Sequence, residues 1–321
     1  MTSELAGLRG QRLLVTGGAG VIAREIIEQL SNLGADVLSV DRLPLAMLPP
    51  RGVTHVRGDL AEMELEPLVA FRPDHVVHLA ATFERAAETP EFWESNWHDN
   101  VVVTHRLAEL AERVPALRTF VYASSYLVYE PAQYLFSAPA SAPVALNEAS
   151  RLGPRNLCGA AKLYGEAEAR FIRDVRGSEA RVVLPRIYRV YGRGSRDVVS
   201  RWVRAALLGD RVDVYHPENL FDYVYSGDVA EGILRLALSP EAAGPVNLAS
   251  GRSRPVGDVI AGIERATGRS LRRRQVAVDE PYEASQADVG RLRELTGWIP
   301  GTELSAGIER VVAFERSAGT R

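Results

Sequence analysis

Short runs of β-branched and aliphatic residues alternate with amphipathic stretches through the first half of the chain. These runs are short and almost continuously apolar, which is typical of strands that are covered on both faces of a sheet. Between them, apolar residues recur at helical spacing. The expected strands are 12–17, 35–41, 53–59, 75–81, 118–125 and 181–192, and the expected helices are 21–33, 90–113 and 156–173. The alternation predicts an α/β chain with a parallel sheet between two layers of helices.

The pattern changes in the second half to shorter helices and strands that are separated by turn residues. We therefore expect a doubly wound parallel sheet of the Rossmann type in residues 1–185, with a return at about 221–243. Residues 186–220 and 244–321 are expected to form a smaller mixed α/β domain that binds the substrate. The stretch 131–149, rich in Ala, Pro and Ser, is expected to be a loop at the mouth of the site.

Composition and charge exclude several classes of protein. With 46% hydrophobic residues among 321, the chain can fill a sizeable core. Lys and Arg total 38 against 41 Asp and Glu, and the net charge of −3 without a polybasic run argues against a nucleic-acid or anionic-membrane surface. The single cysteine cannot form an internal disulfide, and no apolar stretch has the length of a membrane span. We therefore expect a cytoplasmic protein, with no bound metal.

A glycine-rich turn, TGGAGVIA, joins the first expected strand to the first helix. Gly17 can make the tight turn, Gly20 lets the backbone approach a phosphate, and Ala23 permits close packing of helix on sheet. The N–H groups at the helix start then face the pyrophosphate of a dinucleotide. Asp41, at the end of the second strand, can accept hydrogen bonds from the ribose and would repel a ribose phosphate, which favours NAD over NADP. Arg42 leaves NADP as a weaker alternative, or is a solvated surface charge.

The order of several motifs points to a family. TGGAGVIA is followed by GDL at 58–60, HLAA at 78–81, SSYLVY at 124–129, Lys162 and RIYRVYG at 186–192. In this order they resemble the extended short-chain dehydrogenase/reductases, specifically the NAD-dependent nucleotide-sugar epimerases and dehydratases, almost from end to end. The resemblance implies a tightly held NAD that removes hydride from a sugar carbon and later returns it, without net redox change. It also implies a possible homodimer through the helices around 95–113 and 156–173.

The same resemblance implies roles for individual residues. Asp59 and Leu60 would contact the adenine. Lys162 would bind the nicotinamide ribose and lower nearby pKa values, and Ser125 would hydrogen-bond the oxygen being oxidised. The alternatives are that Asp59 caps a turn, Ser125 satisfies a strand end and Lys162 is an exposed helix lysine. The cofactor residues expected in this way are Gly17, Gly20, Val21, Ile22, Asp41, Arg42, Asp59, Leu60, Leu79, Ala80, Ala81, Ser124, Lys162, Pro185 and Tyr188.

The catalytic centre departs from the family pattern at its usual tyrosine. Relatives carry Tyr-x-x-x-Lys on one helical face, whereas this chain has Cys158 four residues before Lys162. A thiol has a reference pKa of about 8.5, and a nearby ammonium favours its anion. Cys158 could therefore move protons directly or through a water. The alternative is that it is a small buried packing residue.

The acid pair of sugar 4,6-dehydratases is also missing. Tyr126 and Leu127 stand in its place, which argues against an ordinary 4,6-dehydratase. The Tyr126 phenol could donate a proton to a leaving hydroxyl, or form an aromatic wall of the pocket. Glu84, in the loop after HLAAT, is a further candidate acid or base, with a solvated carboxylate as the alternative.

Charged contacts to the substrate are expected to be rearranged. Phe221 replaces an arginine that commonly meets the diphosphate, and Arg189 replaces an asparagine. These changes suggest that Arg189, with Arg193 or Arg196, supplies the diphosphate contacts, although Arg189 could instead brace a hinge between domains. Val214 and Tyr215 lie where relatives hold the nucleotide base, or pack in a sheet.

These departures resemble the UDP-N-acetylglucosamine 5,6-dehydratases of tunicamycin-type nucleoside biosynthesis more than a housekeeping epimerase. Such an enzyme oxidises carbon 4, eliminates water across carbons 5 and 6, and returns hydride to carbon 4. The first alternative is a UDP-sugar 4-epimerase, which has no use for a leaving-group acid. The second is a catalytically silent NAD-binding sensor, in which Cys158 records lost activity.

Overall fold

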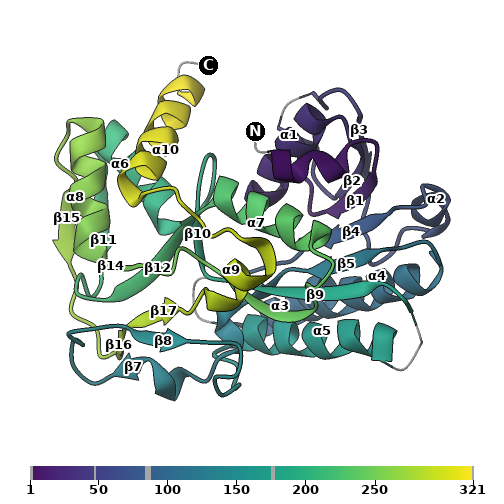
Figure 1. Cartoon of the computed structure of the whole chain (residues 1–321). Helices are drawn as coiled ribbons and strands as arrows, with labels where there is room; N and C mark the ends of the chain where they lie inside the picture. Colours follow the sequence, from purple (N-terminus) through teal and green to yellow (C-terminus); the bar gives the residue numbers. More distant parts are fainter. Residues whose placement is uncertain (1–2, 47, 84–87, 175–177, 320–321) are drawn as a thin grey trace.

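The computed structural model describes residues 3–46, 48–83, 88–174 and 178–319. Its centre is an eight-stranded sheet of order β13-β9-β5-β4-β1-β2-β3, in which the short β6 also pairs with β9 (Figure 1). All of these pairings are parallel. The strands are β1 (Arg12–Thr16), β2 (Asp36–Asp41), β3 (Val53–Arg57), β4 (His75–His78), β5 (Thr119–Tyr122), β6 (Ser124–Ser125), β9 (Arg181–Ile187) and β13 (Gly244–Leu248).

Neighbouring residues of each central strand enter two different cores. On β1, Leu13 and Val15 belong to the core on one face of the sheet, while Leu14 belongs to the core on the other, and all three are fully buried. This explains the continuous apolar runs, because both faces of a parallel sheet need apolar side chains. The predicted Rossmann-type α/β fold is therefore confirmed.

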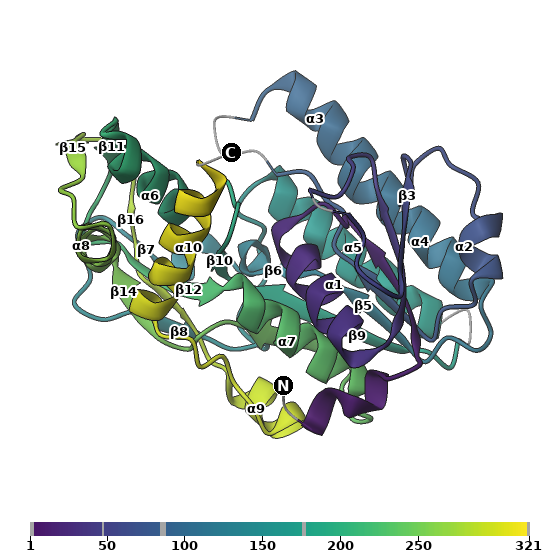
Figure 2. The ribbon, with the colours of Figure 1, turned by 90° about the horizontal axis from the view of Figure 1, so that it is seen from above.

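Helices from distant parts of the sequence form the two covering layers (Figure 2). One layer contains α1 (Val21–Leu33) and α7 (Ser226–Leu238), and the other contains α2 (Glu66–Ala70), α4 (Val103–Glu112) and α5 (Leu157–Asp174). The expected helix at 90–113 is divided into α3 (Pro90–Asn96), a π-helical segment η2 (Trp97–Val102) and α4. Short 3-10 turns occupy η1 (Ser3–Leu8), η3 (Tyr126–Val128) and η4 (Pro131–Gln133).

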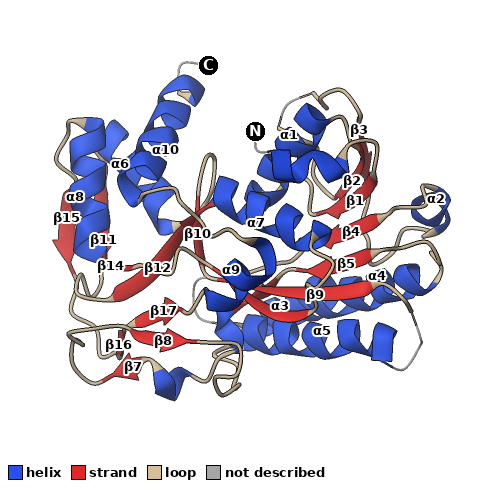
Figure 3. Ribbon diagram, in the orientation of Figure 1, coloured by secondary structure: helices blue, strands red, loops and turns tan. Residues whose placement is uncertain are grey.

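The second part of the molecule has its own core around a three-stranded sheet, beside the main sheet (Figure 3). That sheet has the order β10 (Arg189–Tyr191), β12 (Leu220–Tyr225) and β14 (Ser253–Pro255). The helices of this part are α6 (Val198–Leu208), α8 (Val256–Thr267) and α10 (Leu304–Ala318). Short strand pairs are β11 (Arg211–Val214) with β15 (Arg272–Gln275), β7 (Leu135–Phe136) with β16 (Tyr282–Glu283), and β8 (Val144–Leu146) with β17 (Ser285–Ala287).

Three features differ from the expected organisation. The main sheet extends beyond the return segment 221–243, because β13 pairs with β9 and its Val246 and Leu248 are fully buried. In contrast, β12 lies in the second part. The stretch 131–149 is tied down by β7 and β8, whose partner strands lie more than a hundred residues later. Helix α9 (Gly290–Thr296) follows β17 in the chain and packs near β13 of the main sheet. Within the described ranges, no helix combines the length and apolarity needed to cross a membrane.

Candidate functional site

The glycine turn is shaped by close backbone contacts. Gly17 has a φ of 71°, and a Cβ there would lie 2.8 Å from the nitrogen of Ala80. Gly20 caps α1 without a side chain, and a Cβ there would lie 2.9 Å from the Gly17 carbonyl oxygen. Only glycine satisfies both positions, since the first needs left-handed backbone and the second has no room. The first N–H groups of α1, with the positive end of its dipole, are thereby exposed to an anion.

A cavity of about 150 Å³ lies at this turn and collects most of the expected cofactor residues. Asp41 accepts hydrogen bonds from the nitrogens of Ala19 at 3.0 Å and Leu43 at 2.9 Å, so its carboxylate is held at the cavity wall. Its remaining lone pairs are available to ribose hydroxyls. The lining residues are Gly17, Gly20, Asp41, Arg42, Gly58, Asp59, Leu60, Leu79, Ala80, Ala81, Asp99 and Val103. A turn without side chains beside a fixed carboxylate fits a dinucleotide.

Arg42 is occupied by carboxylates. Its guanidinium lies 2.7 Å from Asp99 and 3.7 Å from Asp59, and His98 contacts the same two carboxylates at 2.8 and 3.9 Å. Burial opposes the charge of Arg42, but the carboxylates of Asp99, Asp59 and Asp41 together outweigh burial and raise its pKa. Because two carboxylates face this cation, Arg42 is poorly placed to attract a ribose phosphate. Sequence reasoning missed Asp99, because its partner is 57 residues away.

We expect Asp41→Asn to relax the choice between NAD and NADP. The substitution removes the charge that would repel a 2′-phosphate, so the affinity for NADP relative to NAD should rise at least tenfold, about 1.4 kcal/mol. Titration of the cofactor-stripped protein with both dinucleotides measures this ratio. Asp99→Asn, which frees Arg42, should shift it in the same direction. An unchanged ratio in both variants would contradict the assignment of this cavity to the adenosine ribose.

One face of α5 carries Cys158, Lys162 and Glu166 at intervals of four residues. All three are buried, with exposed fractions of 4%, 7% and 0%. The Cys158 Sγ lies 3.9 Å from the carbonyl oxygen of Thr82, in the segment that follows β4. Lys162 Nζ lies 4.9 Å from the centre of the Tyr122 ring. Among the residues that the structure describes, this ammonium has no carboxylate partner, so its charge is free for a ligand.

Burial controls protonation at this face. It raises the pKa of the Cys158 thiol, and the nearby Lys162 ammonium offsets only part of that effect. Burial likewise lowers the pKa of Lys162. The thiol therefore stays protonated at neutral pH in the protein alone. Desolvation is thus the larger effect on the thiol and opposes the effect of the ammonium, while the role of Cys158 in proton transfer stays a prediction.

A buried network ties the serine strand to the same helix. Ser124 Oγ donates to Glu166 at 2.6 Å, and Arg186 donates to the two oxygens of Glu166 at 2.9 and 2.8 Å. The Arg186 guanidinium lies 5.0 Å from the Tyr129 ring centre. Ser124, expected at the cofactor, thus commits its hydroxyl to Glu166. Ser125 accepts from the nitrogen of Leu127 at 3.2 Å, which leaves its proton to donate.

Two tyrosines stack beyond Ser125. Tyr126 and Tyr188 have ring centres 5.0 Å apart at an angle of 23°. Burial raises the pKa of Tyr126 well above its usual range, and the nearby Arg189 offsets only part of this, so the phenol keeps its proton. Pro185, another expected cofactor residue, pairs with Val246 inside the main sheet. Glu84 lies outside the described residues.

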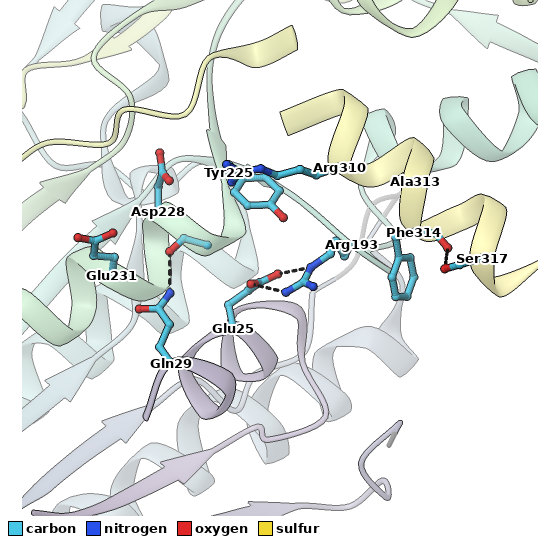
Figure 4. Close-up of a pocket in the computed structure, with 11 residues that line it drawn as sticks. Glu25, Gln29, Arg193, Tyr225, Asp228, Glu231, Arg310, Ala313, Phe314 and Ser317 are labelled. Carbon is cyan, nitrogen blue, oxygen red and sulfur yellow. Dashed lines mark hydrogen bonds and ion pairs between the residues drawn. The ribbon is translucent and has the colours of Figure 1, made fainter. Parts of the chain in front are cut away.

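The expected substrate arginines are not together. Arg193 pairs with Glu25 at 2.7 Å and Glu28 at 2.8 Å, both on α1, and lines a separate cleft of about 660 Å³ between α1, α7 and α10 (Figure 4). Arg196 is exposed. Arg189 instead pairs with Glu283 at 3.0 Å.

The expected base contacts differ in exposure. Val214 is buried at the end of β11, whereas the following Tyr215 is 50% exposed.

The structure also reveals Arg155 and Glu283, which sequence reasoning missed. The two are 128 residues apart in the chain, so no local pattern links them. Sequence reasoning also missed Glu166, although it follows Lys162 by four residues, just as Lys162 follows Cys158. The described residues contain no cluster of His, Cys, Asp or Glu that could hold a metal ion.

Comparison with known proteins identifies the family. The sequence profile of the NAD dependent epimerase/dehydratase family matches residues 13–249. The UDP-glucose 4-epimerase of Mycolicibacterium smegmatis is 28% identical over 332 residues, covering 95% of this chain and 99% of that protein. UDP-glucuronic acid decarboxylase 2 of Arabidopsis thaliana is 26% identical over 324 residues, with coverages of 95% and 68%.

Solved structures give the same picture. MoeE5 in complex with UDP-glucose and NAD has a TM-score of 0.82 at 26% identity, covering 96% of this chain and 99% of that one. The Thermus thermophilus UDP-glucose 4-epimerase in complex with NAD also has a TM-score of 0.82, at 25% identity and with coverages of 96% and 100%. This chain therefore belongs to the NAD-dependent epimerase/dehydratase family, as an enzyme that uses NAD.

Proposed function

We propose that the protein is a UDP-N-acetylglucosamine 5,6-dehydratase that works by transient oxidation at carbon 4. Relatives that act on UDP-sugars support the substrate class, and their 4-epimerases support chemistry at carbon 4. Bound NAD supplies a reversible hydride acceptor for that carbon. The observation that carries the dehydratase proposal is Tyr126, a buried phenol directly after Ser125 that keeps its proton because burial raises its pKa.

In this proposal, each side chain performs one step. Ser125 donates a hydrogen bond to the oxygen on carbon 4, and the Lys162 ammonium favours negative charge there as the C–H bond breaks. The ketone acidifies the proton on carbon 5. Glu84, the other candidate acid or base, accepts that proton, and the electron pair of the broken C–H bond forms the double bond to carbon 6. The hydroxyl on carbon 6 leaves as water with the proton of Tyr126, which is later replaced from Glu84 through solvent. Hydride and a proton then return to carbon 4 and its oxygen, so the net reaction is loss of one water.

Cys158 has a smaller part. Its thiol is shorter than the usual phenol and stays protonated. We therefore place a water in the remaining space, held by Cys158, as the carrier of protons to and from the oxygen on carbon 4.

Two substitutions at Cys158 test this role. Cys158→Ser keeps a donor of similar size and should retain most of the activity. Cys158→Leu excludes the water and should abolish the activity.

The product identifies the reaction. Incubation with UDP-N-acetylglucosamine should give a nucleotide sugar lighter by one water, with the proton spectrum of an exocyclic double bond. In heavy water, unreacted substrate should gain deuterium at carbon 5. A product of unchanged mass with inverted carbon 4 would instead establish the 4-epimerase alternative, which the similarity to UDP-glucose 4-epimerases favours. Tight NAD binding without any NADH-like absorbance would establish the sensor.

We also propose that two copies associate through α3, η2 and α5. Four large side chains are exposed there: Trp93 and Trp97 at 63% each, Tyr164 at 50% and Phe171 at 48%. Each pair lies on one helical face, and an apolar surface of this kind marks an interface. Trp97→Glu should convert a dimer to a monomer in light scattering. Leu208→Glu, at a 74% exposed site on α6, is the matched control. A monomeric wild-type chain would contradict the proposal.

A further inference from the structure

Two arginines from different parts of the fold meet at one buried carboxylate. Arg155 precedes α5, and Arg189 begins β10. Both donate to the same oxygen, Oε2, of Glu283 in β16, Arg189 at 3.0 Å. Ser285 donates to the other oxygen at 2.9 Å. The Glu283 side chain is 2% exposed, so every accessible charge of this cluster belongs to the arginines.

The arginine side chains are partly exposed and held against aromatic rings. Their exposed fractions are 31% for Arg155 and 33% for Arg189. The Arg189 guanidinium lies 3.7 Å from the centre of the Phe221 ring, and that of Arg155 lies 6.0 Å from the Tyr134 ring. A carboxylate on one edge and a ring on one face fix a planar guanidinium, and its other N–H groups remain available to an oxyanion.

The charge of the cluster favours an anion. Burial would raise the pKa of Glu283, but the two guanidiniums outweigh burial and lower it, so the carboxylate is ionised. Two cations and one anion leave one net positive charge. In contrast, Arg193 faces both Glu25 and Glu28 and retains no net charge for a ligand.

The cluster is also close to the reactive serine. Tyr126 directly follows Ser125, and the Arg189 guanidinium lies 5.7 Å from the Tyr126 ring centre. The cluster therefore contacts the residue next to Ser125 in the chain.

We propose that Arg155 and Arg189, held in place by Glu283, bind the diphosphate of the nucleotide-sugar substrate. The inference rests on the proposed function, in that the ligand is a nucleoside diphosphate sugar. It gives Arg189 a partner from the cofactor-binding half, Arg155, in place of Arg193 or Arg196. Phe221, where relatives have an arginine, becomes the surface against which Arg189 stacks. Glu283 is a positioning residue for both guanidiniums.

Binding measurements on the NAD-loaded protein test this directly. UDP and uridine are titrated by calorimetry into the wild-type chain, Arg155→Gln and Arg189→Gln. Each substitution should weaken UDP binding at least tenfold and change uridine binding less than twofold, because uridine lacks phosphates. The dependence of UDP affinity on salt should also become shallower, because each substitution removes one charge whose attraction salt screens. Arg155→Lys should recover part of the loss.

The controls separate charge from structure. Arg204→Gln removes an arginine of similar exposure that pairs with Glu315, and should leave UDP binding unchanged. Unchanged UDP affinity in Arg155→Gln, or equal losses for UDP and uridine, would overturn the proposal, as would a tenfold loss in Arg193→Gln. Because these measurements need no turnover, normal UDP binding with the expected losses but without dehydration would refute only the proposed reaction. Absence of UDP binding by the wild type would refute both.

Discussion

Replacing Lys162 by methionine is expected to lower kcat about 100- to 1000-fold while leaving the folded protein as stable as before, or more stable. The ammonium is buried without a carboxylate partner in the part of the chain that the structure describes, so folding gains no ion pair from it. Its charge is available only to a ligand, and one preorganised charge of this kind typically contributes two to three powers of ten, roughly 100- to 1000-fold. The rate of NADH-like absorbance change, together with urea unfolding, measures both effects.

The pH dependence of stability provides a second test of the Lys162→Met prediction, because the direction of the change with pH can be derived. Burial lowers the pKa of Lys162 below 10.5 in the folded chain. Between the folded and unfolded pKa values the unfolded chain binds more protons, so this residue makes wild-type stability rise with pH there. Lys162→Met should lack that rise. A loss of stability comparable to the loss of activity would show that the ammonium has a structural partner.

The choice of residue supports the same conclusion. Lys162 is the only lysine in the sequence, which uses arginine everywhere else. A guanidinium stays charged at any physiological pH and spreads its charge over a larger planar group. An ammonium is compact, and its pKa shifts when it is buried. Lys162→Arg should therefore fail almost as completely as Lys162→Met. This compositional signal was present in the sequence and would have identified the position without any family resemblance.

The candidate cofactor residues that the structure brings to one cavity lie in short stretches of chain. The glycine turn, Asp41, and the segments containing Asp59 and Leu79 each act through local backbone geometry, and the parallel sheet brings their carboxyl ends to one cavity. The α/β fold is confirmed by the structure, and the use of NAD is confirmed by the family match. The roles of individual side chains remain predictions.

Features that depend on distant partners could not be read in advance. Arg193 is one of the arginines expected at the substrate diphosphate, yet its partner Glu25 is 168 residues away. The thiol is a second example. Sequence spacing places Cys158 beside an ammonium, but only the packed structure shows that burial outweighs that charge. Spacing identifies neighbours, whereas the balance between desolvation and attraction depends on everything else around them.

The ion pair between Glu166 and Arg186 is expected to be the most sensitive part of the fold. Glu166→Leu should cost about 3–5 kcal/mol of unfolding free energy, because it leaves a guanidinium that is 2% exposed without its anion. Arg186→Met should cost a similar amount of unfolding free energy, because it leaves the buried Glu166 carboxylate without its cation. Combining Glu166→Leu with Arg186→Met removes both charges and should be much less destabilising than the sum of the single changes.

Urea unfolding of the four proteins measures this non-additivity, and breaking the more exposed Arg204–Glu315 pair should cost no more than about 1 kcal/mol. The double variant has a further use. It keeps a stable core but loses the bond from Ser124 to Glu166, which aligns the serine strand with the Cys158 and Lys162 face of α5. It should therefore fold and retain NAD while kcat falls at nearly constant KM. Full activity in the double variant would mean that α5 holds its register without this network.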